Sequence, residues 1–129
     1  MKILLVEDSK FLRLATERAL TAAGYEVVSA GDGEQALVLA REHFPSLVLL
    51  DVMLPKMSGL DVVKALKKDP ATASIPVMML TGLSQKNAIQ MEKDGASCFF
   101  EKSDSMLGKG PESLVAAVDR ILKEPSSAR

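Results

Sequence analysis

The sequence has few of the residue types that mark specialised classes of protein. Its 129 residues include one cysteine, one histidine and no tryptophan. The lone Cys98 cannot form an internal disulfide, and its place in an apolar run favours a buried, unreactive thiol. A chain of this length buries an adequate core without disulfides or structural metals. The scarcity of cysteine therefore excludes a disulfide framework and leaves an ordinary globular domain.

Neither a long apolar run nor an excess of charge is present. Lys and Arg number 16 against 17 Asp and Glu, for a formal net charge of −1, and no basic stretch stands out. We therefore expect neither nucleic acid nor an acidic membrane as a partner. Two acids stop the first apolar run, residues 3–6, and no run approaches the roughly 20 residues of a membrane helix. We expect no signal peptide, no membrane span and a cytoplasmic location.

What the sequence does contain is a regular alternation of short apolar runs with amphipathic segments. This alternation is typical of βαβ units, in which helices join parallel strands. Strands are predicted at 2–6, 25–29, 47–51, 76–81 and 97–101, and helices at 10–23, 33–43, 58–68, 84–93 and 111–123. The first, third and fourth strands are continuously apolar, which predicts burial on both faces of the sheet. We expect one domain over residues 1–123, followed by a polar tail at 124–129.

A few residues predict where helices end and which faces they bury. Gly24 follows the first helix as a C-cap would, and Pro45 and Pro70 end the second and third. The predicted core stripe of the first helix comprises Leu12, Ala15, Ala19 and Ala23. Phe11 and Leu14 fall outside that stripe, close to the acids that precede the helix.

Polar side chains stand where four of the apolar runs stop. Glu7 and Asp8 follow the first strand, Asp51 ends the third, Thr81 ends the fourth, and Lys102 follows the last. Any one of them is explained as a group that solvates a loop or caps a helix. Their recurrence at successive strands favours a site, because the carboxyl ends of parallel strands meet at one edge of a sheet and ligands bind there.

The acids predict the chemistry of that site. With the strand order 2-1-3-4-5, the crevice lies between the first and third strands, where Glu7, Asp8 and Asp51 stand. Three carboxylates in one crevice repel one another, and a hard divalent cation such as Mg²⁺ removes the conflict. A carboxylate beside Mg²⁺, faced by Lys102 and Thr81, also suits nucleophilic attack on a phosphoryl group.

Four sequence motifs identify a family. They are VEDS at 6–9, LLDVMLPKMSGLDVV at 49–63, MMLTG at 78–82 and GASCFFEK at 95–102. In this order and spacing the chain resembles a response-regulator receiver domain of two-component signalling over nearly its whole length. The resemblance implies a flavodoxin-like α/β fold: a doubly wound, five-stranded parallel sheet, order 2-1-3-4-5, with five helices on two faces.

The resemblance also implies what the site residues do. Asp51 is the expected phosphoacceptor, supplied by a sensor histidine kinase or a histidine phosphotransfer protein. Mg²⁺ is bound directly by Asp8, Asp51 and the backbone carbonyl of Met53, and by Glu7 mostly through water. Such a protein accepts a phosphoryl group with limited activity of its own, and we do not expect an enzyme with turnover.

Further roles concern the signal and its partners. Lys102 is expected to pair with Asp51 and then with the phosphoryl group, while Thr81 binds a phosphoryl oxygen and moves inward. Phe99 then turns inward and alters contacts with a downstream effector that the sequence does not identify. Phe11 and Leu14 are proposed as partial docking sites for the kinase, or else they only cover a neighbouring side chain.

The chain departs from the family at several positions. Ser103 replaces the usual proline after Lys102, so the preceding bond is either trans or a strained cis bond costing roughly 3–4 kcal/mol. The following loop, 103–110, is longer than usual. Met53 and Leu83 cannot orient water, which predicts slow loss of phosphate. The only histidine, His43, is expected to be exposed, so the phosphodonor histidine comes from another protein.

Three other functions are alternatives to a receiver. A phosphatase with an aspartyl intermediate typically carries a second acid two residues after the nucleophile, where Met53 stands here. A degenerate receiver, acting as a constitutive interaction module, would not need the intact set of Glu7, Asp8, Asp51, Thr81 and Lys102. A flavin-binding protein would need aromatic residues and phosphate-binding hydroxyls near the first strand, and these are missing.

Overall fold

The fold is an α/β sandwich built on a parallel sheet. A computed structural model describes residues 1–51, 57–81, 98–101 and 110–123. Its strands are β1 (Lys2–Val6), β2 (Glu26–Ala30), β3 (Leu47–Asp51), β4 (Val77–Thr81) and β5 (Cys98–Glu101). Among the described residues they pair in the order β2-β1-β3-β4-β5, and every pair is parallel. The predicted parallel sheet with helices on both faces is therefore confirmed.

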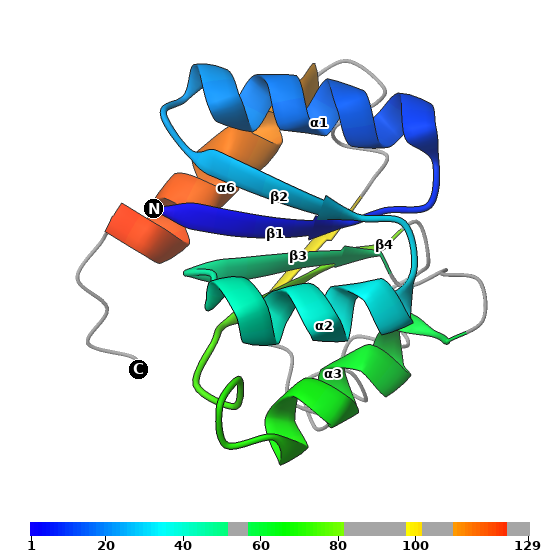
Figure 1. The fold of residues 1–129 in the computed structure, drawn as a ribbon. Coiled ribbons are helices and arrows are strands. Elements are labelled where there is room, and N and C mark those ends of the chain that lie inside the picture. The colour runs from blue at the N-terminus through cyan, green and yellow to red at the C-terminus, as the bar shows by residue number, and fades with distance from the viewer. Residues whose placement is uncertain (52–56, 82–97, 102–109, 124–129) are drawn as a thin grey trace.

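Helices cover the two faces of this sheet (Figure 1). They are α1 (Lys10–Ala22), α2 (Gly33–His43), α3 (Gly59–Lys68) and α6 (Gly110–Lys123). Helices α1 and α6 lie on one face, and α2 and α3 lie on the other. The predicted helix at 84–93, the loop at 103–110 except for its last residue and the tail at 124–129 lie outside the described residues.

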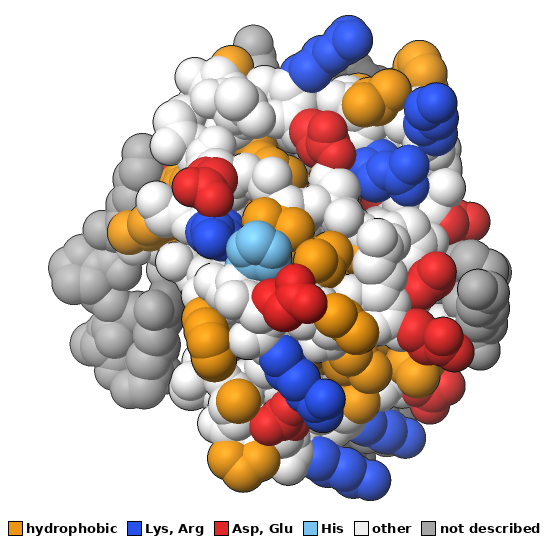
Figure 2. Space-filling view, viewed as in Figure 1, with side chains coloured by type: hydrophobic (Ala, Val, Ile, Leu, Met, Phe, Trp, Pro, Cys, Tyr) orange, Lys and Arg blue, Asp and Glu red, His pale blue; other side chains and the backbone are white. Residues whose placement is uncertain are grey.

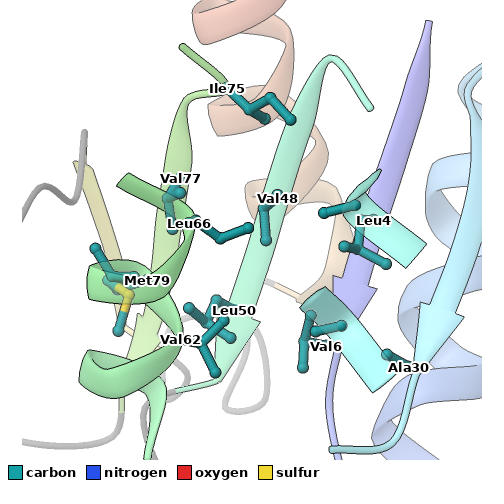
Figure 3. Close-up of a cluster of buried hydrophobic side chains, with 13 residues drawn as sticks. Leu4, Val6, Ala30, Val48, Leu50, Val62, Leu66, Ile75, Val77 and Met79 are labelled. Carbon is teal, nitrogen blue, oxygen red and sulfur yellow. The ribbon is translucent and has the colours of Figure 1, made fainter. Parts of the chain in front are cut away.

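Alternate residues of the central strands supply two hydrophobic cores. On the α2 and α3 face, Leu4, Val48 and Leu50 pack with Val62 and Leu66 of α3 (Figure 3). The intervening side chains face the other way. On the α1 and α6 face the cluster includes Ile3, Leu5, Leu47, Leu49, Leu20 and Val118. Because β1, β3 and β4 contribute to both clusters, the prediction that their continuous apolar runs are buried on both faces is confirmed.

The boundaries of the elements follow local backbone chemistry. Gly24 has a φ of 99°, the left-handed conformation that ends a helix without a steric cost for glycine. Tyr25 donates its N–H to the carbonyl of Leu20, 3.1 Å away. Because that bond belongs to the helix end, β2 begins at Glu26, one residue later than predicted. Helix α2 ends at His43 as predicted, and Phe44 caps it in a left-handed conformation, which the sequence did not predict, just before Pro45.

The predicted core stripe of α1 is wrong in part. Leu20, which was not included in it, is the fully buried residue of this helix. The predicted members, Leu12, Ala15, Ala19 and Ala23, are only partly buried. Helix α1 packs against α6 as well as against the sheet. Leu20 lies eight residues after Leu12, on the same helical face, and its cluster includes Val118 of α6.

Candidate functional site

Two adjacent central strands bring three acidic residues together. Strands β1 and β3 pair with Val6 opposite Leu50, so the chain leaves both strands at the same edge of the sheet. Carboxylate oxygens of Glu7, Asp8 and Asp51 all lie within 4.8 Å of one another. Glu7 and Asp51 are 3% and 2% exposed, whereas Asp8 is exposed to solvent. The predicted juxtaposition of these carboxylates is therefore present.

The turn after β1 is fixed by hydrogen bonds at Glu7. Its backbone N–H donates to the carbonyl of Ala30 at 3.1 Å, which continues the pairing of β1 with β2. Its Oε2 accepts the backbone N–H of Ser9 at 3.2 Å. Its backbone carbonyl accepts Nη1 of Arg13 at 2.9 Å. The bond from Ser9 gives the buried carboxylate a partner, as burial requires, and the other two hold the backbone of Glu7.

The amino end of α1 lies directly beside the acids. Ser9 is its N-cap, and its hydroxyl accepts the N–H of Leu12 at 3.4 Å. The helix dipole places partial positive charge at this end. The helix therefore presents partial positive charge toward the acids that precede it.

The donor set fits a hard divalent cation. All three groups offer carboxylate oxygens, which suit Mg²⁺ and do not favour a soft metal. Two oxygens bound directly to one Mg²⁺ lie at most about 4.2 Å apart, twice the usual metal–oxygen distance. A limit of 4.8 Å therefore accommodates two direct carboxylate ligands and a third that binds through water. The carboxylates of Glu7, Asp8 and Asp51 are close enough together for this arrangement.

The remaining predicted site residues are placed only by the backbone, or lie outside the described residues. Asp51 is opposite Leu80 in the register, so Thr81 lies one step beyond Asp51 at the same edge. Thr81 is itself opposite Glu101, and Phe99 is opposite Met79. Met53, Leu83, Lys102 and Ser103 are not among the described residues.

Two residues on the first helix are exposed as predicted, but the histidine is not. Phe11 and Leu14 are 78% and 41% exposed. His43 is partly buried, which corrects the expectation of an exposed side chain. Its Nδ1 lies 3.3 Å from Nζ of Lys2 and therefore accepts from that ammonium. Since Lys2 begins β1 and Asp51 ends β3, His43 lies at the opposite edge of the sheet from the acids.

Sequence reasoning missed Arg13. Its guanidinium holds the Glu7 carbonyl from within α1. An arginine in a helix is common, and only the spacing of six residues from Glu7, with the helix start between them, could have drawn attention to it.

Figure 2 shows acidic side chains gathered along the edge of the molecule toward which the arrows of β1, β2 and β3 point in Figure 1.

A parallel α/β domain with an acidic cluster at the carboxyl edge of its central strands defines a broad class of protein. Within that class, the sequence matches the family model described as "Response regulator receiver domain" over residues 3–108. The chain belongs to the response regulator receiver family. Receiver domains are regulators and not enzymes with turnover, in keeping with the expectation from the sequence.

Individual relatives agree with that assignment. The probable transcriptional regulator ycf27 of Porphyra purpurea is 45% identical over 123 residues, which cover 95% of this chain and 47% of that protein. Response regulator PleD of Caulobacter vibrioides is 39% identical over 134 residues, covering 99% of this chain and 30% of that protein. The chain thus spans half or less of the length of these curated relatives.

Solved structures share the fold. The chemotaxis response regulator CheY4 of Vibrio cholerae superposes with a TM-score of 0.84 at 32% identity, covering 94% of this chain and 98% of that one. A response regulator from Desulfuromonas acetoxidans gives a TM-score of 0.81 at 32% identity, covering 95% of this chain and 96% of that one. Within the described part of the chain, no helix is both long and apolar enough to span a membrane.

Proposed function

We propose that this chain accepts a phosphoryl group on Asp51, in the presence of Mg²⁺, from a sensor histidine kinase or a histidine phosphotransfer protein. The observation that carries the proposal is the cluster of Glu7, Asp8 and Asp51 at the edge between β1 and β3. Membership of the receiver family supports it. Asp51 is the nucleophile of the three because it ends the third strand, within the motif at 49–63 that resembles the family's phosphoacceptor strand.

The chemistry requires one nucleophile and several positive groups. A carboxylate oxygen of Asp51 attacks phosphorus, the P–N bond to the donor imidazole breaks, and the histidine leaves with its nitrogen reprotonated. Mg²⁺ held by Asp8, Asp51 and the Met53 carbonyl, with Glu7 through water, would neutralise charge on the phosphoryl oxygens. Lys102 supplies a further positive charge at that group.

The same proposal covers the signal. The Thr81 hydroxyl donates a hydrogen bond to a phosphoryl oxygen and draws its loop inward. The side chain of Phe99, on β5, then turns inward. A local change of charge thereby biases two arrangements of one surface. The partner that reads this surface is an effector protein of unknown identity.

Several finer features belong with this function. We propose that the chain has the complete receiver fold, with five strands in the order 2-1-3-4-5 and five helices. The domain would span residues 1–123, followed by a tail at 124–129. We also include a cytoplasmic location and no binding of nucleic acid or membrane by residues 1–129. The near-zero net charge supports the last point. The ycf27 relatives are named as transcriptional regulators, but this chain covers only part of their length.

A phosphorylation assay tests the proposal. The protein is incubated with phosphoramidate, with Mg²⁺ or with EDTA, and its intact mass is followed. We expect an adduct of one phosphoryl group that requires Mg²⁺ and is absent in Asp51→Asn, with Asp61→Asn on α3 as a matched control. No adduct would favour a constitutive interaction module, and steady phosphate release over many turnovers would favour a phosphatase.

Phe11 and Leu14 are proposed as docking residues for the phosphodonor. Both are exposed on the helix whose amino end lies beside the acids. Phe11→Ala and Leu14→Ala should slow phosphotransfer from the donor protein but leave phosphorylation by phosphoramidate unchanged. Val38→Ala, a substitution of an exposed apolar residue on α2, is the control. Equal transfer rates in all three variants would refute a docking role.

A further inference from the structure

The guanidinium of Arg13 contacts the peptide group that links two of the clustered acids. From α1, Nη1 of Arg13 donates to the backbone carbonyl of Glu7 at 2.9 Å. That carbonyl belongs to the peptide bond between Glu7 and Asp8. Because a peptide group is planar, one hydrogen bond to its oxygen restrains rotation on both sides of it. The bond therefore restrains the directions in which the chain presents both carboxylates.

Two other bonds at Glu7 act on different groups. The Glu7 N–H is held by Ala30, on the side of β2, and Oε2 is held by the N–H of Ser9. The first restrains the peptide that precedes Glu7, and the second joins the Glu7 side chain to the peptide that follows Asp8. Asp8 is exposed, so its carboxylate receives little restraint from packing. The restraint that Arg13 places on the Glu7–Asp8 peptide therefore bears most on Asp8.

A glycine leaves room for the guanidinium. A Cβ atom built on Gly31 would lie 3.4 Å from Nη1 of Arg13. Gly31 does not have a positive φ, so a side chain is compatible with its backbone. A β-branched side chain at this position would extend beyond that Cβ and displace the guanidinium. The environment of Arg13 thus offers a second, independent way to disturb the contact.

We propose that Arg13 is a positioning residue that raises Mg²⁺ affinity by holding the Glu7–Asp8 peptide. The proposal rests on Mg²⁺ binding, which belongs to the proposed function. Loss of a group that orients metal ligands typically weakens metal binding by about 10- to 100-fold. The sign of the effect is informative. A guanidinium acting only through its charge would repel Mg²⁺, so its removal would strengthen binding.

Direct Mg²⁺ titration without any phosphodonor tests this role. Dissociation constants are measured by calorimetry or by amide chemical shifts for the wild type, Arg13→Ala, Arg13→Lys and Gly31→Val. Arg18→Ala, which changes an exposed arginine on the same helix, is the control. We expect about tenfold weaker binding in Arg13→Ala and Gly31→Val, partial recovery in Arg13→Lys, and no change in Arg18→Ala.

The outcomes separate the two proposals. Thermal melting in EDTA establishes that each variant is folded at the titration temperature. If Arg13→Ala is unfolded there, the comparison rests on Arg13→Lys and Gly31→Val. Unchanged or tighter binding in the Arg13 variants, with normal binding by the wild type, would overturn the positioning role alone. A wild type that binds no Mg²⁺ would overturn the proposed function as well.

Discussion

Three polar side chains are buried among the described residues: Glu7, Asp51 and Thr72. The first two belong to the acidic cluster, and the third supports the turn between α3 and β4. The Thr72 hydroxyl donates to the carbonyl of Leu66 at 2.7 Å. Lys67 joins the same turn, since its Nζ donates to the carbonyl of Ile75 at 2.8 Å, and burial lowers the pKa of this amine. Each buried polar side chain therefore belongs either to the acidic cluster or to the turn that connects α3 with β4.

The Thr72 hydroxyl should contribute measurably to stability. Thr72→Val keeps the shape of the side chain but leaves the Leu66 carbonyl without its donor. We expect the free energy of unfolding to fall by about 1–3 kcal/mol, the cost of leaving a buried polar group unsatisfied. Urea denaturation provides the measurement. Thr72→Ser retains the hydroxyl, and if it lost as much stability as Thr72→Val, the hydrogen bond would not be the cause.

At the scale of elements, a side-chain bond ties α6 to the start of β2. The Tyr25 hydroxyl donates to Oδ1 of Asp119 on α6. Burial, followed by the bond to Asp119 and its negative charge, raises the pKa of Tyr25 from 10.0 to about 12. Since the folded state holds the phenolic proton more tightly, this stabilisation is complete below pH 10. It is lost as the pH rises through about 12.

This shift is directly observable, because Tyr25 is the only tyrosine and tryptophan is absent. Alkaline titration followed by tyrosinate absorbance should give a midpoint near 12 in the wild type. Asp119→Asn removes the charge and should move the midpoint toward 10, though not fully, since burial remains. Circular dichroism over the same pH range separates titration from unfolding. A wild-type midpoint at 10 while the fold persists would contradict the predicted tether.

The elements that the sequence predicted well are those whose patterns arise locally. Apolar runs located the strands to within one residue, and both β1 and β3 were predicted with both of their ends. The start of β2 was predicted one residue early because a hydrogen bond with the preceding helix determines it. Tyr25 is apolar enough to extend a strand, but its N–H is taken by Leu20 at the end of α1. Leu20 was left out of the predicted stripe although it lies eight residues after Leu12, on the same helical face, and it packs with strand residues and with Val118 of α6.

Some residues of the candidate site could likewise be predicted from the sequence, and others could not. The acids could be predicted because parallel strands place their carboxyl ends at one edge, so topology converts sequence position into proximity. Arg13 could not, since its role depends on where one flexible side chain points. The half-buried state of His43 was also unpredictable, because its partner Lys2 is 41 residues away.

At the scale of the whole molecule, the acidic cluster should oppose folding when no metal is bound. Two like charges less than 5 Å apart repel by about 1 kcal/mol in water and more near a protein surface. Folding of the metal-free protein assembles three such groups. Mg²⁺ that binds only the folded state should add about 2.7 kcal/mol at 100 times its dissociation constant.

Thermal melting of Asp51→Asn tests this opposition. In EDTA the variant should melt higher than the wild type, because one of the repelling charges is gone. In Mg²⁺ it should gain less than the wild type gains. Glu42→Gln, an exposed carboxylate at the end of α2, controls for the change in net charge. A variant that melts below the wild type in EDTA would indicate that Asp51 stabilises the metal-free fold instead.

The middle position of β1 between β2 and β3 also affects how the chain is made. Residues 2–6 are translated well before both of their neighbouring strands. At roughly 5–20 residues per second, residue 51 follows residue 6 by about 2–9 s. During that interval an apolar strand has at least one unpaired edge, open to wrong partners. The acids at positions 7 and 8, which directly follow this strand, place negative charge beside it and disfavour its association with a second nascent chain.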